Sequence, residues 1–464
     1  MFDYDLIVIG VGPAGEKAAA QAAYFGKRVV AIERAADPGG AGTQTGTVPS
    51  KTLRETAMYL SGYRSREMYG VAVELEATAT LPRLMSRKAA IVASETQRIR
   101  DNLARHGVTC MGGVARLVDA NTVEVVNASG TRRVTGSVIL IATGSRPARP
   151  ADIDFNDARI HDSDEILDLE NLPRSMTILG AGVIGCEYAC TFAALGVKVT
   201  LVDARDSLFG FLDHELVEQL VASMRRMGID LKLGTRWTSV ARRGGMVVTR
   251  FPDGLEIEAE QLMYAAGREG RTQDLNLAAV GIVPDKRGYL AVNAKYQTQV
   301  PNILAAGDAI GFPALAATSM EQGRVAVCHA FGFDYKQSVA ELLPYGLYTI
   351  PEASSLGETE ATCRQKGIDY AVGRAWYAKS ARGKIAGDTE GLLKLIVERG
   401  SRRLIGVHVI GERATELVHI GQAVVHLGGT IDVFIEMVFN FPSLAESYKY
   451  AAYDCLGHLA SPKA

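Results

Sequence analysis

Cysteine is scarce in this sequence, with six residues in a chain of 464, and no two of them form a Cys-x-x-Cys pair. A chain of this length can bury large apolar cores without disulfides, so we expect buried, reduced thiols. Cys186 and Cys190 are four residues apart on a predicted helix and share a face, where they could pair or bind a metal. No further metal ligand accompanies them, which favours packing as small apolar side chains.

Long apolar runs and a strong net charge are also absent. No run of eighteen apolar residues occurs, residues 1–5 are acidic where a signal peptide would be basic, and the formal net charge is −2. These features argue against a membrane span, a secretory leader and a basic field for nucleic acid. The expectation is a cytoplasmic globular protein of two or three domains that binds small molecules, with no nucleic-acid or membrane partner.

A strand, a glycine-rich turn and a small-residue helix occur together twice. In each copy the turn reads Gly-x-Gly-x-x-Gly, and a second apolar run ends in an acid at the same spacing. Such glycines let the backbone approach a pyrophosphate at the helix N-terminus, and the acid suits a ribose hydroxyl. Ordinary tight turns would explain a single glycine triplet in a chain with 48 glycines, but the repeated context predicts two nucleotide-binding units. The residues are Gly10, Gly12, Gly15 and Glu33 in the first copy, and Gly180, Gly182, Gly185 and Asp203 in the second.

Patterns elsewhere predict the remaining architecture. Residues 81–106 have helical spacing and predict one long surface helix, whereas the apolar run at 138–147 predicts a strand that ends in a glycine turn. The last quarter of the chain shows the alternating residue pattern typical of strands, which predicts strands at 392–397 and 404–410. A helix is predicted at 414–426. The predicted fold is therefore α/β, with two Rossmann-like dinucleotide-binding domains and a C-terminal α+β domain, which we expect to pack against a second subunit.

The glycine-rich stretch 39–51 ends in Pro-Ser-Lys and is predicted to open a helix whose N-terminal amides face a flat cofactor. It resembles the redox loop of the flavin disulfide reductases, the family of dihydrolipoamide dehydrogenase and glutathione reductase. In that family two cysteines five residues apart face the flavin, whereas the corresponding residues here are Gly42 and Thr47. The resemblance implies bound FAD and a pyridine nucleotide substrate without a redox disulfide.

Three further segments carry the same resemblance in the family's order. Residues 142–147 resemble the turn at which the family's flavin domain ends and its nicotinamide domain begins. Residues 264–268 form a similar segment at the end of the nicotinamide domain. Residues 298–308 resemble the segment whose aspartate holds the ribityl chain of FAD. The resemblance implies an FAD-binding domain at 1–150 and 270–341, an NAD(P)-binding domain at 151–269 and a dimerisation domain at 342–464. It also implies cofactor contacts at Gly40, Gly42, Thr43, Ala115, Thr143, Gly144, Arg205, Gly267, Arg268, Gly307, Asp308, Leu315 and Ala316.

Lys51 and Glu187 are the predicted catalytic residues. By resemblance, Lys51 matches the family lysine near the flavin N5, and Glu187 matches the carboxylate that pairs with it. A cation beside the ring stabilises negative charge on it. Without the resemblance, the two residues would be interpreted as a helix-end lysine and a solvated glutamate.

The proton-handling residues of the disulfide reductases are incomplete. The family's His-Pro-Thr-x-x-Glu segment, supplied by the other subunit, is Phe-Pro-Ser-Leu-Ala-Glu here, so Phe441 replaces the histidine and only Glu446 remains. His419 and His426 lie seven residues apart on one predicted helix and are expected to pack at a subunit face. We expect none of the eight histidines to pair with a cysteine or serine nucleophile.

The chain resembles one subgroup of the family, the soluble pyridine nucleotide transhydrogenases, at residues 46–51, 180–188 and 348–352. Its members also lack the disulfide and the histidine, although they commonly keep one cysteine at the position of Gly42. One cysteine cannot form a disulfide within the chain, so we expect little loss of hydride transfer. The resemblance implies a ping-pong cycle in a homodimer or higher homo-oligomer: NADPH gives hydride to FAD, NADP departs, and NAD collects the hydride at the same site.

Such a site must accept both nucleotides. Asp203 suits the free 2′-hydroxyl of NAD and should repel a 2′-phosphate, whereas Arg205 could attract one. Arg205 as an ordinary surface cation is a nearly equal alternative. Two other functions stay open: an NAD(P)H:quinone or dye reductase on the same scaffold, and a non-catalytic flavin-binding or interaction protein. The intact glycine motifs, Lys51 and Glu187 weigh against the second of these.

Overall fold

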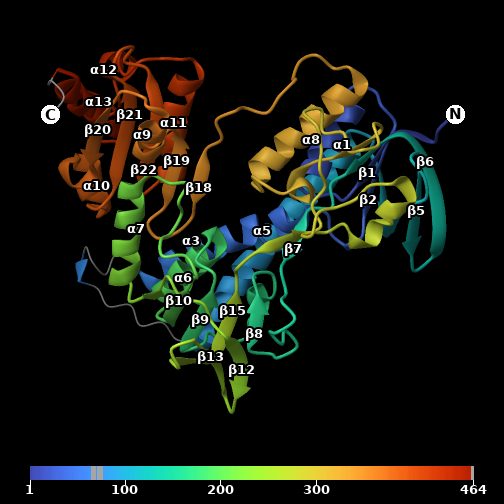
Figure 1. Cartoon of the computed structure of the whole chain (residues 1–464), viewed down its shortest axis with the longest axis horizontal. Helices are drawn as coiled ribbons and strands as arrows, with labels where there is room; N and C mark the ends of the chain where they lie inside the picture. The colour runs from blue at the N-terminus through green and yellow to red at the C-terminus, as the bar shows by residue number, and fades with distance from the viewer. Residues whose placement is uncertain (64–68, 71–76, 461–464) are drawn as a thin grey trace.

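The first unit is a largely parallel sheet with helices against one face. A computed structural model describes residues 1–63, 69–70 and 77–460 (Figure 1). The strands of this unit are β1 (Tyr4–Ile9), β2 (Val29–Glu33), β3 (Thr109–Gly112), β4 (Val114–Leu117), β5 (Thr122–Asn127), β6 (Gly130–Ile141) and β17 (Ile303–Ala305). Its helices are α1 (Pro13–Tyr24), α2 (Gly40–Gln44), α3 (Thr47–Ser61), α5 (Ala77–Arg105) and α8 (Ala316–Phe331). The sheet order is β3-β2-β1-β6-β5-β4, and β17 pairs with β6.

Strand β1 is apolar from Leu6 to Ile9 because both of its faces are covered there. Leu6 and Val8 point into a cluster with α1, α5 and α8, whereas Ile7 and Ile9 point into a second cluster with β4 and β5. Alternate side chains of a strand face opposite sides, so a doubly covered strand reads as an unbroken apolar run. The carboxyl ends of β1 and β2 therefore meet at one edge, where the first glycine turn lies.

The second unit repeats this arrangement. Its parallel sheet has the order β11-β10-β9-β15-β8, and the antiparallel β12-β13-β14 lies beside it. The bounds are β8 (Ile160–Asp162), β9 (Ser175–Leu179), β10 (Lys198–Val202), β11 (Asp230–Lys232), β12 (Ser239–Arg243), β13 (Met246–Arg250), β14 (Glu256–Ala259), β15 (Gln261–Tyr264), α6 (Val183–Ala194) and α7 (His214–Arg226). A two-stranded sheet of β7 (Ser145–Pro147) and β16 (Arg268–Gly270) forms where the chain enters and leaves this unit.

The third unit is an antiparallel sheet packed with helices. Its order is β18-β19-β22-β21-β20. The bounds are β18 (Tyr345–Leu347), β19 (Ala353–Gly357), β20 (Tyr370–Trp376), β21 (Leu392–Glu398), β22 (Leu404–Ile410), α9 (Glu360–Lys366), α10 (Ala381–Ala386), α11 (Ala414–His426), α12 (Asp432–Glu436) and α13 (Ser447–Ala460). Within the described ranges the chain also forms five short 3-10 helices: η1 (Glu165–Asp168), η2 (Gln273–Leu275), η3 (Leu277–Val280), η4 (Gly307–Ile310) and η5 (Tyr377–Lys379). The predicted strands and helix of this region are confirmed, and so is the predicted fold class.

One apolar cluster crosses all three units. It contains Leu53 of α3, Leu84 of α5, Cys186 of α6 and Leu347 of β18. The long helix predicted at 81–106 is confirmed as α5, whose first half packs in this cluster and whose second half packs on the first sheet. Burial of this shared apolar surface holds α3 against α6, which is the contact on which the site below depends.

All six cysteines are free thiols, and all but the exposed Cys110 are buried. Cys186 and Cys190 lie fully buried in the shared cluster, so the packing interpretation is confirmed. Burial raises the pKa of both thiols, that of Cys190 to about 12, which keeps them protonated and unreactive. Among the described residues, none of the helices combines the length and apolar character that crossing a membrane requires.

Candidate active site

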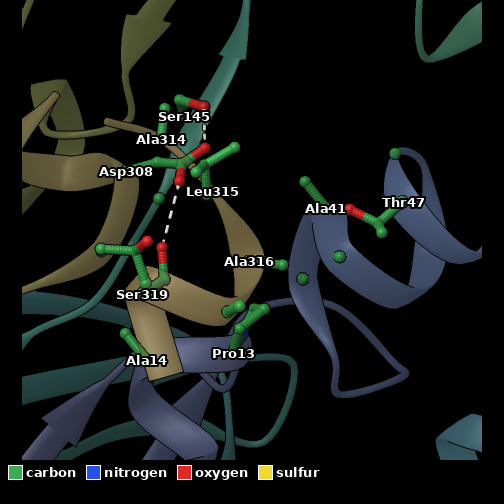
Figure 2. Close-up of a pocket in the computed structure, with 18 of the residues that line it drawn as sticks. Pro13, Ala14, Ala41, Thr47, Ser145, Asp308, Ala314, Leu315, Ala316 and Ser319 are labelled. Carbon is green, nitrogen blue, oxygen red and sulfur yellow. Dashed lines mark hydrogen bonds between the residues drawn. The ribbon is translucent and has the colours of Figure 1, made fainter. Parts of the chain in front are cut away.

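A cavity of about 920 Å³ lies where the three units meet, large enough for an extended cofactor. Figure 2 shows part of its wall, with Asp308, Ser145 and Ser319 on one side and Ala41 and Thr47, from the helices α2 and α3, on the other. The predicted site residues that line the cavity are Gly10, Gly12, Glu33, Gly40, Gly42, Lys51, Ala115, Thr143, Gly144, Glu187, Arg268, Gly307, Asp308, Leu315 and Ala316.

The first and third glycines of both motifs are required by close backbone contacts. A Cβ added to Gly15 would lie 1.9 Å from the carbonyl oxygen of Gly10, and one added to Gly185 would lie 1.9 Å from that of Gly180. Gly10 and Gly180 have φ of 96° and 106°, a conformation that residues with side chains rarely adopt. The two copies thus share one local geometry, that of a dinucleotide-binding turn.

The middle glycines leave the helix N-termini open. Gly12 caps α1, and a Cβ on the facing Gly40 would lie 2.9 Å from the Gly12 Cα. Gly182 caps α6, and a Cβ added there would meet nothing within 4 Å. Backbone amides at a helix N-terminus attract anions, so these two openings suit the phosphates of two nucleotides.

The acids of the two motifs brace their turns. Glu33 Oε2 accepts a hydrogen bond from the Val11 N–H at 2.8 Å, and Asp203 Oδ2 accepts one from the Ala181 N–H at 2.6 Å. Arg205 donates to both oxygens of Asp203, from Nε at 2.9 Å and Nη2 at 2.7 Å. Burial opposes the charge of Asp203, but these bonds hold the pKa of its carboxyl below the ordinary value. Arg205 is therefore paired with Asp203, although its side chain is 56% exposed, and its role towards a 2′-phosphate stays a prediction.

The stretch 39–51 forms two helices, α2 and α3, where only one helix was predicted. Gly39 and Gly40 begin α2 with φ of 117° and 53°. A Cβ added to Gly42 would lie 2.7 Å from Pro13 Cγ, so any side chain at this position requires Pro13 to move. Thr47 is the first residue of α3 and lines the cavity. No sulfur atom occurs at either position that faces the predicted flavin.

Lys51 and Glu187 form an ion pair between α3 and α6. The Lys51 Nζ lies 2.6 Å from Glu187 Oε2, and the Tyr348 N–H donates to Glu187 Oε1 at 2.9 Å. The same Nζ lies 4.9 Å from the centroid of the Tyr348 ring. Glu187 is only 7% exposed, so its interpretation as a solvated glutamate is wrong. The three units together hold one cation at the cavity wall.

A second polar group lies at the other side of the cavity. Ser145 donates to Asp308 Oδ2 at 2.8 Å, and Arg268 Nε donates to the Ser145 hydroxyl at 2.9 Å (Figure 2 shows the first bond). Gln322 accepts a hydrogen bond from the Gly307 N–H at 2.9 Å and fixes the turn before Asp308. These bonds hold the carboxylate of Asp308 in one orientation, as a residue that binds hydroxyl groups requires.

Unsatisfied polar atoms around this cavity fit a polar cofactor. Thr143 Oγ1, Arg271 Nε and Asp164 Oδ1 are buried without a hydrogen-bond partner. Asp164 lies 3.7 Å from Arg271 and 3.9 Å from Arg268, while burial raises the pKa of its carboxyl. Buried polar groups are costly when left unpaired, so a ligand that carries its own polar atoms would be stabilised here. Residues that could hold FAD are therefore present.

The other predicted residues lie away from the cavity lining. Thr43 is buried in α2 and packs against Gly39. A Cβ added to Gly39 would lie 2.6 Å from the Thr43 Cβ. The remainder belong to the turns and strands of the two nucleotide units: Gly15, Gly180, Gly182, Gly185, Asp203, Arg205 and Gly267. Tyr348, Ser145 and Arg271 were not predicted as site residues. Tyr348 and Ser145 lay inside segments singled out for their resemblance, which was the one available signal.

One histidine pairs with a serine in the core, which leaves the expectation about nucleophile pairs uncontradicted. The Ser355 hydroxyl lies 2.6 Å from His408 Nδ1, and His408 Nε2 lies 2.8 Å from the Glu358 carbonyl oxygen. Both side chains are buried between β19 and β22, and burial lowers the pKa of His408. The pair satisfies a polar core and is closed to a substrate. His419 lines the cavity from α11, and its Nδ1 lies 2.7 Å from Gln422 Oε1.

Comparisons with known proteins agree with this geometry. A family model described as pyridine nucleotide-disulphide oxidoreductase matches residues 4–323, and one described as the dimerisation domain of the same family matches residues 343–452. A soluble pyridine nucleotide transhydrogenase of Mycobacterium tuberculosis (strain ATCC 25177 / H37Ra) is 45% identical, covering 99% of this chain and 98% of its own. One of Colwellia psychrerythraea is 40% identical, covering 99% of both chains.

Solved structures show the same overall fold. The HOCl-induced flavoprotein disulfide reductase RclA from Escherichia coli superposes with a TM-score of 0.88 at 26% identity, over 97% of this chain and 99% of that one. LpdA from Mycobacterium tuberculosis superposes with a TM-score of 0.89 at 28% identity, over 97% and 99%.

Proposed function

The chain belongs to the pyridine nucleotide-disulphide oxidoreductase family, and from this premise we propose that it is an NAD(P) transhydrogenase that passes hydride from NADPH through FAD to NAD in a ping-pong cycle. As a member of this family the protein is an FAD-dependent oxidoreductase that uses pyridine nucleotides. Bound FAD supplies the capacity to accept a hydride from one nucleotide and return it to another. The transhydrogenases at 40–45% identity support the finer assignment.

The observation that carries the proposal is the ion pair of Lys51 and Glu187 together with the absence of a cysteine at positions 42 and 47. Lys51 would stabilise negative charge on the flavin ring, and Glu187 with the Tyr348 N–H holds the ammonium in place. Gly42 and Thr47 offer no thiol, and the pair of buried cysteines on α6 is protonated. Electrons that reach FAD from one nucleotide cannot pass on to a disulfide at these positions. A second nucleotide that binds at the same face of the flavin is therefore the simplest acceptor.

The remaining residues would bind and orient the cofactors. We assign residues 1–150 and 270–341 to FAD, with Gly12 at the pyrophosphate, Glu33 at a ribose and Asp308 at the ribityl chain. Residues 151–269 would hold NAD(P), with Gly182 at its pyrophosphate. Residues 342–464 would form the contact between subunits of a homodimer, in line with the dimerisation model that matches there.

The proposal is tested by supplying purified holoenzyme with NADPH and a thio-analogue of NAD, with a quinone in a parallel reaction. We expect reduction of the analogue at the characteristic wavelength of its reduced form. Fast quinone turnover without analogue reduction would instead establish a quinone reductase. If neither NADPH nor NADH bleaches the bound flavin anaerobically, the protein is a non-catalytic flavoprotein.

Asp203→Asn should shift the nucleotide preference towards NADP. Asparagine keeps an acceptor for the Ala181 N–H, but it removes the charge that opposes a 2′-phosphate and releases Arg205 to bind one. One charged hydrogen bond corresponds to a change of about tenfold or more in the ratio of kcat/KM for NADPH over NADH. Asp206→Asn, at an exposed acid three residues later, is the matched control. Equal ratios in the two variants would show that Asp203 does not select the nucleotide.

A further inference from the structure

Two aromatic side chains from different units meet at the cavity. Phe211 belongs to the segment between β10 and α7, and Tyr345 begins β18. Their ring centroids lie 5.2 Å apart with an interplanar angle of 45°, and both rings line the cavity. Phe211 is 47% exposed. The pair leaves an apolar ring surface facing open space.

The backbone before Phe211 is strained. Phe209 has φ of 45°, in the left-handed region that bulky residues avoid, although its side chain is buried. Its ring lies 5.9 Å from that of Phe211 in an edge-to-face arrangement. Buried Phe209 thus fixes the turn that directs the next aromatic residue outward. Strain of this kind is retained where the surrounding structure enforces it, and it is concentrated at binding and catalytic sites.

The backbone after Phe211 is fastened to the third unit. Asp213 caps α7, and Lys394 Nζ of β21 lies 2.7 Å from its Oδ1. Lys394 is 1% exposed and lies 2.5 Å from Glu360 as well. The short segment that carries Phe211 is therefore held at both ends. This rigidity would let an exposed ring keep one position without packing of its own.

The aromatic pair lines the same cavity as Lys51 and Glu187, and β18, which begins with Tyr345, leads to Tyr348 at that end of the cavity. Tyr345 comes three residues before Tyr348, whose N–H binds Glu187, and Val183 and Lys51 line the same space. A nucleotide that reacts with the flavin must bring its nicotinamide to this end. The nicotinamide ring is flat, and in its oxidised form it carries a positive charge, so it is attracted by aromatic faces.

We propose that Phe211 and Tyr345 form an aromatic wall that holds the nicotinamide end of the bound pyridine nucleotide. This inference rests on the proposed function, because it concerns the substrate of that site. NAD and NADP are identical at the nicotinamide end, so the wall serves both nucleotides equally. Its role thus differs from that of Asp203, which distinguishes them at the adenosine end.

The test measures binding without turnover. NAD, NADP and ADP-ribose, which lacks nicotinamide, are titrated calorimetrically into oxidised holoenzyme carrying Phe211→Ala, Phe211→Tyr or Tyr345→Ala. Phe211→Ala should raise the Kd of both dinucleotides by about tenfold and leave the Kd of ADP-ribose unchanged. Phe211→Tyr keeps an aromatic ring and should bind both dinucleotides as the wild type does. Tyr345→Ala should repeat the pattern with a smaller effect. The control is Phe25→Ala, at a 42% exposed ring outside the cavity that packs 4.5 Å from Phe333.

Each outcome decides between the claims. Unchanged dinucleotide Kd in Phe211→Ala, or an equal loss for ADP-ribose, overturns the aromatic wall while the proposed function stands. Failure of NADPH to reduce the flavin of the unmodified holoenzyme would overturn the proposed function itself. A change in the ratio of the NAD and NADP constants would assign Phe211 to the adenosine end instead.

Discussion

Lys51→Met should slow the reduction of bound FAD by NADPH by about 100- to 1,000-fold, the usual effect of removing one preorganised group that stabilises charge in a water-poor site. The ammonium lies at the cavity wall, paired with Glu187 and 4.9 Å from the Tyr348 ring. Its loss should also make the midpoint potential of the flavin more negative. Anaerobic stopped-flow absorbance gives the rate, and a dye-coupled titration gives the potential.

The control for this substitution is Lys88→Met. Lys88 is also a largely buried lysine, and it lies on α5, outside the cavity. Its Nζ donates to the Leu167 carbonyl oxygen at 2.5 Å. Glu187→Gln should slow reduction less, by about tenfold, because the amide still accepts the Tyr348 N–H but no longer fixes the ammonium by charge. If Lys51→Met reduces flavin as fast as Lys88→Met, then Lys51 has no part in hydride transfer.

Lys394→Met should lower the free energy of unfolding by about 3–5 kcal/mol, since removal of one partner leaves buried charges uncompensated. Lys394 lies 2.7 Å from Asp213, 3.0 Å from Glu215 and 2.5 Å from Glu360. These carboxylates belong to the second and third units, so the loss should also loosen the contact between them. Denaturant unfolding of the apoprotein, followed by tryptophan fluorescence, measures the change.

The pH dependence of this effect has a definite sign. Burial opposes ionisation of Glu360, but its hydrogen bond from Lys394 holds the pKa of the carboxyl below the value of 4.5 found for a free side chain. The group therefore contributes stability above about pH 4.5, and this contribution is lost as the pH falls through the folded-state pKa. The difference between the wild type and Lys394→Met should shrink in acid. Lys366→Met, at a lysine that is 57% exposed and paired with Glu358, should cost no more than about 1 kcal/mol at any pH.

Local rules made much of the fold predictable. The glycine motifs are fixed by contacts within a few residues, such as the approach of Gly15 to Gly10, so they can be recognised in the sequence. The strands β21 and β22 and the helix α11 follow from their own apolar patterns. Lys51 and Glu187 were identified by resemblance, since no local pattern links residues 136 positions apart.

Other parts of the site depend on assembly between units and could not be predicted. The role of Tyr348 arises only when β18 meets α6, and the exposure of Phe211 arises from the strained Phe209 and the buried Lys394. Helix α2 was missed because three of the residues at 39–42 are glycines, which disfavour helices in isolation. The Ser355–His408 pair escaped prediction because its members are 53 positions apart on neighbouring strands.

A single-turnover experiment tests the central claim that hydride leaves by the nucleotide site. Holoenzyme is reduced anaerobically with one equivalent of NADPH, NADP is removed by gel filtration, and NAD is then added in a stopped-flow instrument. The proposed cycle predicts that flavin absorbance returns while one NADH forms per flavin, at a rate consistent with steady-state turnover. Flavin that stays bleached until a quinone is supplied, with no NADH formed, would contradict it.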